Sequence, residues 1–123
     1  MAWLSVTSTT TGLDSMINIP VEDTLYIEHD ISDRKVYAFT DIDKYYLPGP
    51  LNFWADALKA YGFERGDRNL IIQISKIKSM SRRPFCCAYF ALTPKAIKVE
   101  LSEQNYKRIE KLAAGFNEGI VLF

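Results

Sequence analysis

Two neighbouring stretches of alternating apolar and polar residues constrain the fold of this chain more than any other feature. In residues 24–31 (TLYIEHDI), leucine and isoleucine alternate with tyrosine and glutamate. Residues 34–42 (RKVYAFTDI) show the same alternation. A period of two is typical of a half-buried strand, because successive side chains point to opposite faces. Since only a short polar link separates the two stretches, they predict an antiparallel hairpin.

Two further segments repeat apolar residues at the spacing of a helix. The first covers about residues 50–61: it starts at a proline, which suits the beginning of a helix, and it stops before Gly62. The second covers about residues 103–114 and follows Ser102, whose side chain can cap the first turn. Both segments are predicted to be amphipathic helices.

Short apolar runs fill most of the remaining chain. Strands are predicted over residues 69–77, 84–92 and 96–102, with weaker signals in 1–8 or 16–21, and a turn is predicted over 64–67. The tail GIVLF is predicted to dock as a short strand or a core plug. The pattern favours an α+β fold, with a mainly antiparallel sheet of about five to six strands and two helices packed on one face. At 123 residues, the chain is predicted to be a single domain, 1–123.

Charge is balanced over the whole chain but not along it. Residues 1–61 carry nine acidic and four basic residues, a net charge of −5, and residues 62–123 carry six acidic and eleven basic residues, a net charge of +5. The overall net charge of zero argues against a protein that coats nucleic acid without sequence preference. The asymmetry leaves two arrangements open: two faces of opposite sign that steer partners, or two halves that interleave and cancel.

The two cysteines, Cys86 and Cys87, are adjacent in an apolar run. Neighbouring residues are poorly placed for a disulfide, so both thiols are predicted to be reduced and at least one to be deeply buried. No signal peptide is recognised, and no stretch has the roughly 18 apolar residues that a membrane span needs. The chain is therefore predicted to be cytoplasmic, without membrane contact.

No arrangement of residues points to catalysis. His29 is the only histidine and has no nucleophile pattern around it, while Cys86 lies in apolar surroundings that do not activate a thiol. One histidine and two adjacent cysteines cannot supply a zinc site, and the carboxylates of Asp41 and Asp43 are predicted to be solvated. The glycines are scattered, unlike those of a phosphate loop. The sequence predicts no enzyme, no cofactor and no metal.

Acidic residues and tyrosines gather in the hairpin region and just after it. Tyrosine buries a large rigid area at small entropic cost, and carboxylates beside aromatic rings imitate the phosphates and bases of a nucleic-acid strand. Such a surface would bind the basic cleft of a nuclease. The main prediction is therefore a non-catalytic inhibitor or immunity-type protein that masks a toxin or nuclease. The residues predicted to bind this protein partner are Glu28, Asp30, Asp33, Asp41, Asp43, Tyr45 and Tyr46.

The two tyrosines are predicted to have different roles. Adjacent residues of an extended chain face opposite ways, so a single surface cannot use both. One of Tyr45 and Tyr46 is predicted to be an exposed anchor for the partner, and the other is predicted to pack under the first helix beside Trp54.

Two short stretches resemble parts of known families. DIDKYYLPG (41–49) resembles the acid–Tyr–Tyr–Pro segment of immunity proteins that neutralise nuclease bacteriocins, although it has an extra Leu47 and that family is all-helical. WADALKAYGFERGDRNLIIQI (54–74) is similar to a helix–glycine–strand pattern of SymE-like toxins, whose family implies RNA or DNA binding. Both likenesses are local, and neither assigns the chain to a family.

The first alternative is a nucleic-acid-binding module. Residues 75–84 (SKIKSMSRRP) are predicted to form a basic loop between two strands, which could grip a phosphate backbone. The residues of this alternative site are Lys76, Lys78, Arg82 and Arg83, joined by Lys107, Arg108 and Lys111. The second alternative is a small enzyme of unknown type, built around His29 or Cys86.

Overall fold

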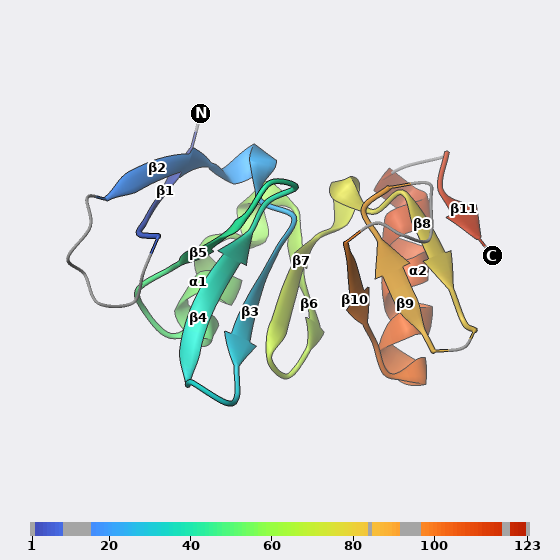
Figure 1. Ribbon diagram of the computed structural model, residues 1–123. Helices are drawn as coiled ribbons and strands as arrows, with labels where there is room; N and C mark the ends of the chain where they lie inside the picture. Colours follow the sequence, from blue (N-terminus) through green and yellow to red (C-terminus); the bar gives the residue numbers. More distant parts are fainter. Residues whose placement is uncertain (1, 9–15, 84, 92–96, 117–118, 123) are drawn as a thin grey trace. The chain divides into compact units, whose positions relative to one another are not determined.

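The computed structural model describes residues 2–8, 16–83, 85–91, 97–116 and 119–122 (Figure 1). Its contacts divide the chain into two compact units, unit 1 (Met1–Ile72) and unit 2 (Gln73–Phe123). Each unit has its own sheet and its own α-helix, so each is described by itself. That the whole chain forms a single domain stays a prediction.

Unit 1 is built around a five-stranded sheet. Across this sheet the order is β5 (Lys44–Tyr46), β4 (Lys35–Phe39), β3 (Tyr26–Asp30), β7 (Leu70–Gln73) and β6 (Phe63–Asp67). The predicted hairpin is confirmed as β3 and β4, which pair antiparallel with Tyr26 opposite Phe39 and Asp30 opposite Lys35. β3 also pairs antiparallel with β7, so β3 is the central strand.

A smaller two-stranded sheet completes unit 1. β1 (Trp3–Val6) and β2 (Ile17–Pro20) pair antiparallel and lead into the short 3-10 helix η1 (Val21–Asp23). The sequence signalled strands in both regions only weakly, and the structure has both. Apolar side chains from these strands join those of the larger sheet and of α1 in one core. Its buried members are Leu4, Val6, Ile19, Val21, Ile27, Val36, Ala38, Leu47, Leu51, Leu58, Phe63 and Ile71.

The first predicted helix is present as α1 (Leu51–Ala57) followed by the 3-10 helix η2 (Lys59–Tyr61). α1 contacts β3 and β6. Trp54 packs against the core and donates its indole N–H to the carbonyl of Pro48 over 3.0 Å. Gly62 ends this segment in the left-handed conformation, with φ of 85°. That conformation favours glycine because a β-carbon would crowd the following carbonyl.

Unit 2 combines a four-stranded sheet with the longer helix α2 (Glu103–Phe116). Across the sheet the order is β10 (Lys98–Glu100), β9 (Cys87–Tyr89), β8 (Ser79–Ser81) and β11 (Val121–Leu122). β11 pairs parallel with β8, so the tail forms the predicted short strand. The 3-10 helix η3 (Ile74–Lys76) contacts α2, which buries Tyr106, Ile109 and Ala113.

The α+β class and a five-stranded sheet are confirmed, but several details differ from the sequence predictions. The two helices belong to different units, and they do not pack together on one face of one sheet. Residues 63–67 form strand β6 where a turn was predicted, because Phe63 and Gly66 are buried although the stretch shows no apolar alternation. The predicted strand 69–77 is cut short by η3. Residues 84, 92 and 96, at the ends of two predicted strands, lie outside the described residues.

Aromatic and lysine side chains line the face of β3, β4 and β5 that is turned away from the unit 1 core. Tyr37 meets Tyr46 edge to face with ring centres 6.4 Å apart. The ammonium of Lys44 lies 4.7 Å from the centre of the Tyr37 ring, and that of Lys35 lies 5.8 Å from the Tyr46 ring. These cation–π contacts tie neighbouring strands together and place positive charge among the predicted acidic residues.

Glu28 lies on this same face, opposite Tyr37 in the strand register. Burial raises the pKa of its carboxyl above the usual value, with a further contribution from the negative charge of Asp30, while Lys44 lowers it. Burial and the charge of Glu28 also raise the pKa of Tyr26 to about 12. The ionised form of Glu28 is therefore less favourable in the folded chain than in the unfolded chain.

Replacing Gly62 with alanine should destabilise the chain by about 1 kcal/mol, because the backbone there has positive φ. No atom lies within 4 Å of the position of the added β-carbon, so the cost comes from the backbone alone. Gly115→Ala in α2 is the matched control, since its β-carbon also meets nothing within 4 Å and its φ is not in the left-handed region. This control should raise stability by up to about 1 kcal/mol. Urea unfolding of both variants gives the comparison, and equal effects would contradict the backbone explanation.

Glu28→Gln should raise stability at neutral pH. The pKa of Glu28 is higher in the folded chain than the 4.5 of the unfolded chain. The protonated carboxyl therefore contributes stability below pH 4.5, and this contribution is lost as the pH rises through the folded-state pKa. Glutamine is neutral at every pH, so the variant avoids that loss. The gain at pH 7 should be less than about 1 kcal/mol, since a half-exposed carboxylate is screened by solvent. Thermal unfolding at pH 7 and at about pH 3 measures it, and the gain should vanish at the lower pH. Glu22→Gln, at an exposed position of η1, should show no gain at either pH.

Candidate nucleic-acid interface

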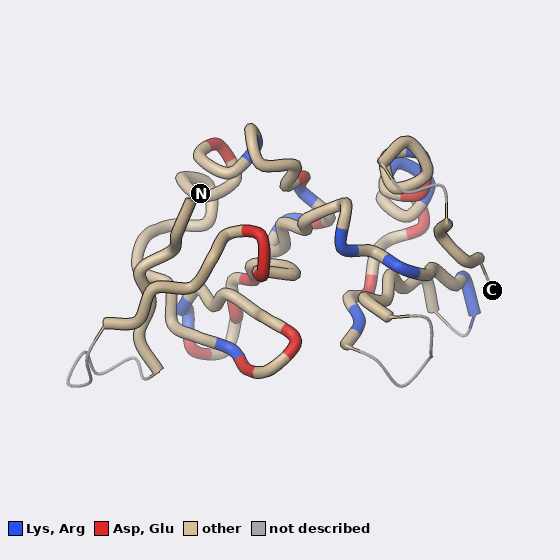
Figure 2. The backbone as a smooth tube through the Cα atoms, turned by 90° about the horizontal axis from the view of Figure 1, so that it is seen from above, with Lys and Arg blue, Asp and Glu red and all other residues tan. Residues whose placement is uncertain are grey.

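The two units carry opposite net charge, as the sequence asymmetry suggested. Residues 1–72 contain eleven acidic and six basic residues, a net charge of −5, whereas residues 73–123 contain four acidic and nine basic residues, a net charge of +5. Figure 2 marks the basic positions along unit 2 and the acidic positions in the turns of unit 1. An anion-binding site in unit 1 would therefore need cations that lie away from its carboxylates.

Strand pairing in unit 1 brings two turns to the same end of the five-stranded sheet. β3 ends at Asp30 and leads into the turn before β4, while the Arg68–Asn69 turn leads into β7, whose first residue, Leu70, lies opposite Glu28 of β3. The backbone N–H of His29 donates to the carbonyl of Asn69 over 2.9 Å and joins this turn to β3. The two turns are thus neighbours, although their sequences are more than thirty residues apart.

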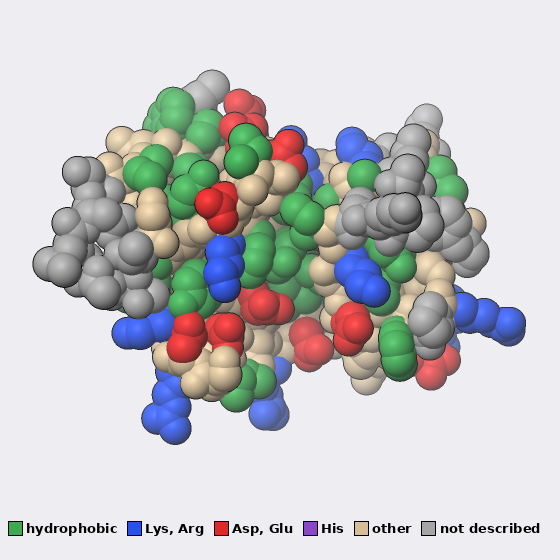
Figure 3. Space-filling view, viewed as in Figure 1, with side chains coloured by type: hydrophobic (Ala, Val, Ile, Leu, Met, Phe, Trp, Pro, Cys, Tyr) green, Lys and Arg blue, Asp and Glu red, His purple; other side chains and the backbone are tan. Residues whose placement is uncertain are grey.

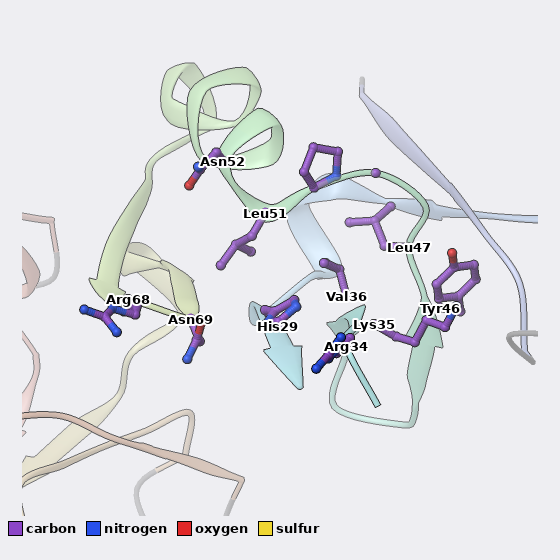
Figure 4. Close-up of a pocket in the computed structure, with 12 residues that line it drawn as sticks. His29, Arg34, Lys35, Val36, Tyr46, Leu47, Leu51, Asn52, Arg68 and Asn69 are labelled. Atoms are coloured by element: carbon purple, nitrogen blue, oxygen red, sulfur yellow. The ribbon is translucent and has the colours of Figure 1, made fainter. Parts of the chain in front are cut away.

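A hollow of about 580 Å³ opens beside these turns (Figure 4). Its lining includes Arg34, just before β4, Lys35, the first residue of β4, and Arg68, in the turn before β7. Asn52, Asn69 and His29 add polar groups, and apolar side chains such as those of Val36 and Leu51 complete the lining. None of its twelve lining residues is acidic. Within a unit of net charge −5, the hollow is a locally positive site.

The turn between β3 and β4 is fixed by its own aspartates. The carboxylate of Asp30 accepts from the backbone N–H of Ser32 over 2.9 Å and from its hydroxyl over 2.6 Å, and these bonds lower the pKa of Asp30. Asp33 accepts from the N–H of Lys35 over 2.9 Å and from the hydroxyl of Tyr37. Arg34 adopts positive φ, 61°, which is uncommon for a residue with a β-carbon. The turn therefore holds Arg34 in one backbone conformation at the hollow.

The second turn is held by Arg65 of β6. One amino group of its guanidinium donates to the carbonyl of Arg68 over 2.8 Å, and the other donates to the side-chain oxygen of Asn52 in α1 over 2.7 Å. The backbone N–H of Arg68 in turn donates to the carboxylate of Asp67 over 2.7 Å. Sequence reasoning missed these residues, because it took residues 64–67 for a turn. The sequence contains one signal for this turn: a basic residue, Arg68, next to a residue with a side-chain amide, Asn69, between two strands.

The structure does not bring the predicted acidic partner site together as one patch. Glu28 and Asp30 share a strand, and Asp33 lies in the turn that follows it, but Asp41 and Asp43 lie in the turn at the other end of β4. Lysine side chains are interspersed with the acidic ones over β3 to β5, as Figure 3 shows. Several of these carboxylates are engaged by backbone N–H groups of their own turns.

The two tyrosines of that predicted site face opposite ways, as expected for an extended strand. Tyr45 packs against the unit 1 core, while Tyr46 lies on the other face against Tyr37. Both side chains are half-buried. Whether either binds a partner stays a prediction.

The residues of the alternative basic site lie in unit 2, in a segment that is not a simple loop. Lys76 belongs to η3 and Lys78 is exposed before β8, whose Ser79, Met80 and Ser81 are buried. Arg82 lies over the ring of Tyr106, 5.0 Å from its centre, and 4.0 Å from the carboxylate of Glu110. Lys78 and Arg83 therefore present charge to solvent, while Arg82 is partly engaged within unit 2.

The residues considered for catalysis belong to different units. His29 lies at the hollow in unit 1, whereas Cys86 and Cys87 lie in unit 2, where both are free thiols and Cys87 is buried as predicted. Burial raises the pKa of the Cys87 thiol. Among the described residues, no group of three or more histidine, cysteine or carboxylate side chains could hold a metal ion. No helix in the described ranges is long and apolar enough to cross a membrane.

Comparison with known proteins gives two matches that agree with each other. Residues 14–114 match the family described as the LytTr DNA-binding domain. The structure is similar to a solved LytTr DNA-binding domain of a methyl-accepting/DNA response regulator from Bacillus cereus, with a TM-score of 0.71 and 18% sequence identity. That similarity covers 91% of this chain and 96% of the other. No curated protein sequence matches the chain.

The main functional prediction is wrong in the light of these matches. A family described as a DNA-binding domain contradicts an inhibitor, antitoxin or immunity-type protein that masks a toxin or nuclease. The nucleic-acid-binding alternative is the reading that the matches support. In the folded chain, the carboxylates of the acidic, tyrosine-containing segment build turns and its tyrosines hold strands together. Since the match spans most of its length, the chain belongs to the LytTR family of DNA-binding domains.

Proposed function

We propose that this chain binds DNA, and that the hollow of unit 1 with its two turns is a principal contact. The observation that carries the proposal is the gathering of Arg34, Lys35 and Arg68 around a hollow without acidic lining, in a unit that is otherwise acidic. Membership of the LytTR family supports DNA as the anion. Catalysis plays no part in the proposed function.

The side chains at the hollow suit both kinds of DNA contact. Arginine binds phosphate or the guanine edge with two parallel hydrogen bonds, and asparagine pairs in the same way with adenine. Arg34, Arg68 and Asn69 thus combine groups for the backbone with groups for base edges. Rigid turns lower the entropy lost on binding, because their backbone is already ordered. Site-specific binding is therefore the expected mode.

Unit 2 supplies a second set of cations for the phosphate backbone. Lys78 and Arg83 are exposed, and the unit carries a net charge of +5. Phosphate contacts add affinity without distinguishing sequences, and they weaken as salt is raised. The residues predicted to contact phosphate from unit 2 remain Lys76, Lys78, Arg82 and Arg83. Replacing them with neutral residues should lower the affinity equally for all DNA sequences.

Arg34→Ala and Arg68→Ala should each weaken binding to a preferred DNA site. The site is first selected from a random duplex library, and affinities are then measured by fluorescence anisotropy over a series of salt concentrations. Each variant should lose about 1–3 kcal/mol on the selected site if its side chain reads a base. A side chain that contacts phosphate should instead lower the salt slope by about 0.9 and weaken all duplexes alike.

Lys59→Ala is the matched control, because Lys59 is an exposed cation of unit 1 that does not line the hollow. It should leave the affinity for the selected site within about twofold of the wild-type value. Unchanged binding in both arginine variants, with the fold intact by circular dichroism, would rule out the hollow as the DNA contact.

The Arg34→Gly variant should lose affinity for DNA without losing folding stability, so it distinguishes the two effects at the turn between β3 and β4. Glycine tolerates the positive φ at this position, so folding stability should be unchanged or higher by up to about 1 kcal/mol. The affinity for the selected DNA should nevertheless fall as far as in Arg34→Ala, because both variants lose the guanidinium. Chemical unfolding and anisotropy measure the two effects. A glycine variant that binds like the wild type would show that the Arg34 side chain does not contact DNA.

A further inference from the structure

We propose that Arg65 is a positioning residue that prepares the Arg68–Asn69 turn and the Asn52 amide for DNA, without contacting DNA itself. The inference rests on the proposed function of the unit 1 hollow. Its basis is the pair of hydrogen bonds from one guanidinium to two different elements, at 2.8 Å to the Arg68 carbonyl and at 2.7 Å to the Asn52 side chain.

The geometry of this contact requires arginine. A guanidinium is planar, and its two amino groups diverge at a fixed angle, so one side chain can bridge two acceptors in a set direction. Arg65 lies in β6 and is half-buried, whereas Asn52 and Arg68 are exposed at the hollow. The bridge therefore runs from a strand at the edge of the sheet to two groups that face solvent. A lysine at this position keeps the charge but lacks the fork.

Both partners of the bridge line the hollow. Arg65 holds the carbonyl of Arg68 from one side, and the carboxylate of Asp67 accepts from the N–H of Arg68. The peptide groups on both sides of the Arg68 side chain are thereby fixed. Because Arg65 donates to the side-chain oxygen of Asn52, the NH₂ group of that amide is left to donate toward the hollow. The bridge thus sets the direction of two groups proposed to meet DNA.

Two of the five N–H groups of the guanidinium, one on each terminal amino group, donate to protein oxygens. Both of these bonds fix groups that line the hollow. In the proposed role the contribution of Arg65 to DNA binding acts through Arg68 and Asn52, so a loss of the bridge should lower the affinity for the preferred sequence rather than the number of phosphates contacted.

A double-mutant cycle between Arg65→Lys and Arg68→Ala tests the inference. Affinity for the selected duplex is measured for the wild-type chain, both single variants and the double variant, each over a salt series. In the wild-type background Arg65→Lys should weaken binding about five- to tenfold with an unchanged salt slope. In the Arg68→Ala background the same substitution should weaken binding by less than about twofold, because the positioned side chain is already absent.

Asn52→Ala provides a second route that keeps Arg65 and breaks the bridge from its other end. Asn52 is exposed, so this variant should fold normally, and amide hydrogen exchange at Arg68 and Asn69 should be faster in it than in the wild type. Amide hydrogen exchange at Arg68 and Asn69 should be faster in Arg65→Lys than in the wild type.

The outcomes separate this inference from the proposed function. A similar loss from Arg65→Lys in both backgrounds would overturn the positioning role, as would wild-type affinity in the lysine variant. A reduced salt slope in Arg65→Lys would overturn it as well, since it would indicate a direct phosphate contact. Wild-type binding by Arg68→Ala would also overturn the positioning role, because there would be no side chain to position. If instead Arg34→Ala and Arg68→Ala both bind like the wild type, the proposed use of the hollow fails, whatever Arg65 does.

Discussion

The antiparallel pairing of β3 with both β4 and β7 is the constraint on which unit 1 depends. It buries Ile27 and Ala38 completely, and burial of such side chains is the largest favourable contribution to folding. The same register decides where the two turns fall. A shift of one residue would send every core side chain of β3 to the opposite face and would separate the turns from each other. Core packing and the position of the cations thus have one cause.

Acidic and basic residues have different functions in unit 1. The carboxylates of Asp30 and Asp33 accept backbone hydrogen bonds within a turn, so their negative charge serves local structure. The cations Arg34 and Arg68 directly follow aspartates along the chain, and both line the hollow. A net charge of zero is the sum of these contributions, and it does not exclude a strongly positive site.

The sequence predicted local structure better than function. The hairpin, both helices and the end of the first helical segment at Gly62 followed from periodicity and capping, because these depend on neighbouring residues. Strand β6 was missed because Phe63–Asp67 shows no apolar alternation, although Phe63 and Gly66 are buried. Arg34 and Arg68 could not be placed together from the sequence, since only the pairing of β3 with β7 makes their turns neighbours. The acidic segment was assigned to a partner because its intrachain hydrogen bonds were not foreseeable.

The contact between Trp54 and the segment before α1 has a spectroscopic consequence. The chain contains two tryptophans, and Trp3 is 54% exposed. The indole of Trp54, by contrast, is hydrogen-bonded to Pro48 and lies against Gly49, which lines the hollow. Its emission depends on whether that bond and that packing persist when the hollow is occupied. In a Trp3→Phe background, the intrinsic fluorescence of the chain becomes a label-free optical signal from one wall of the hollow.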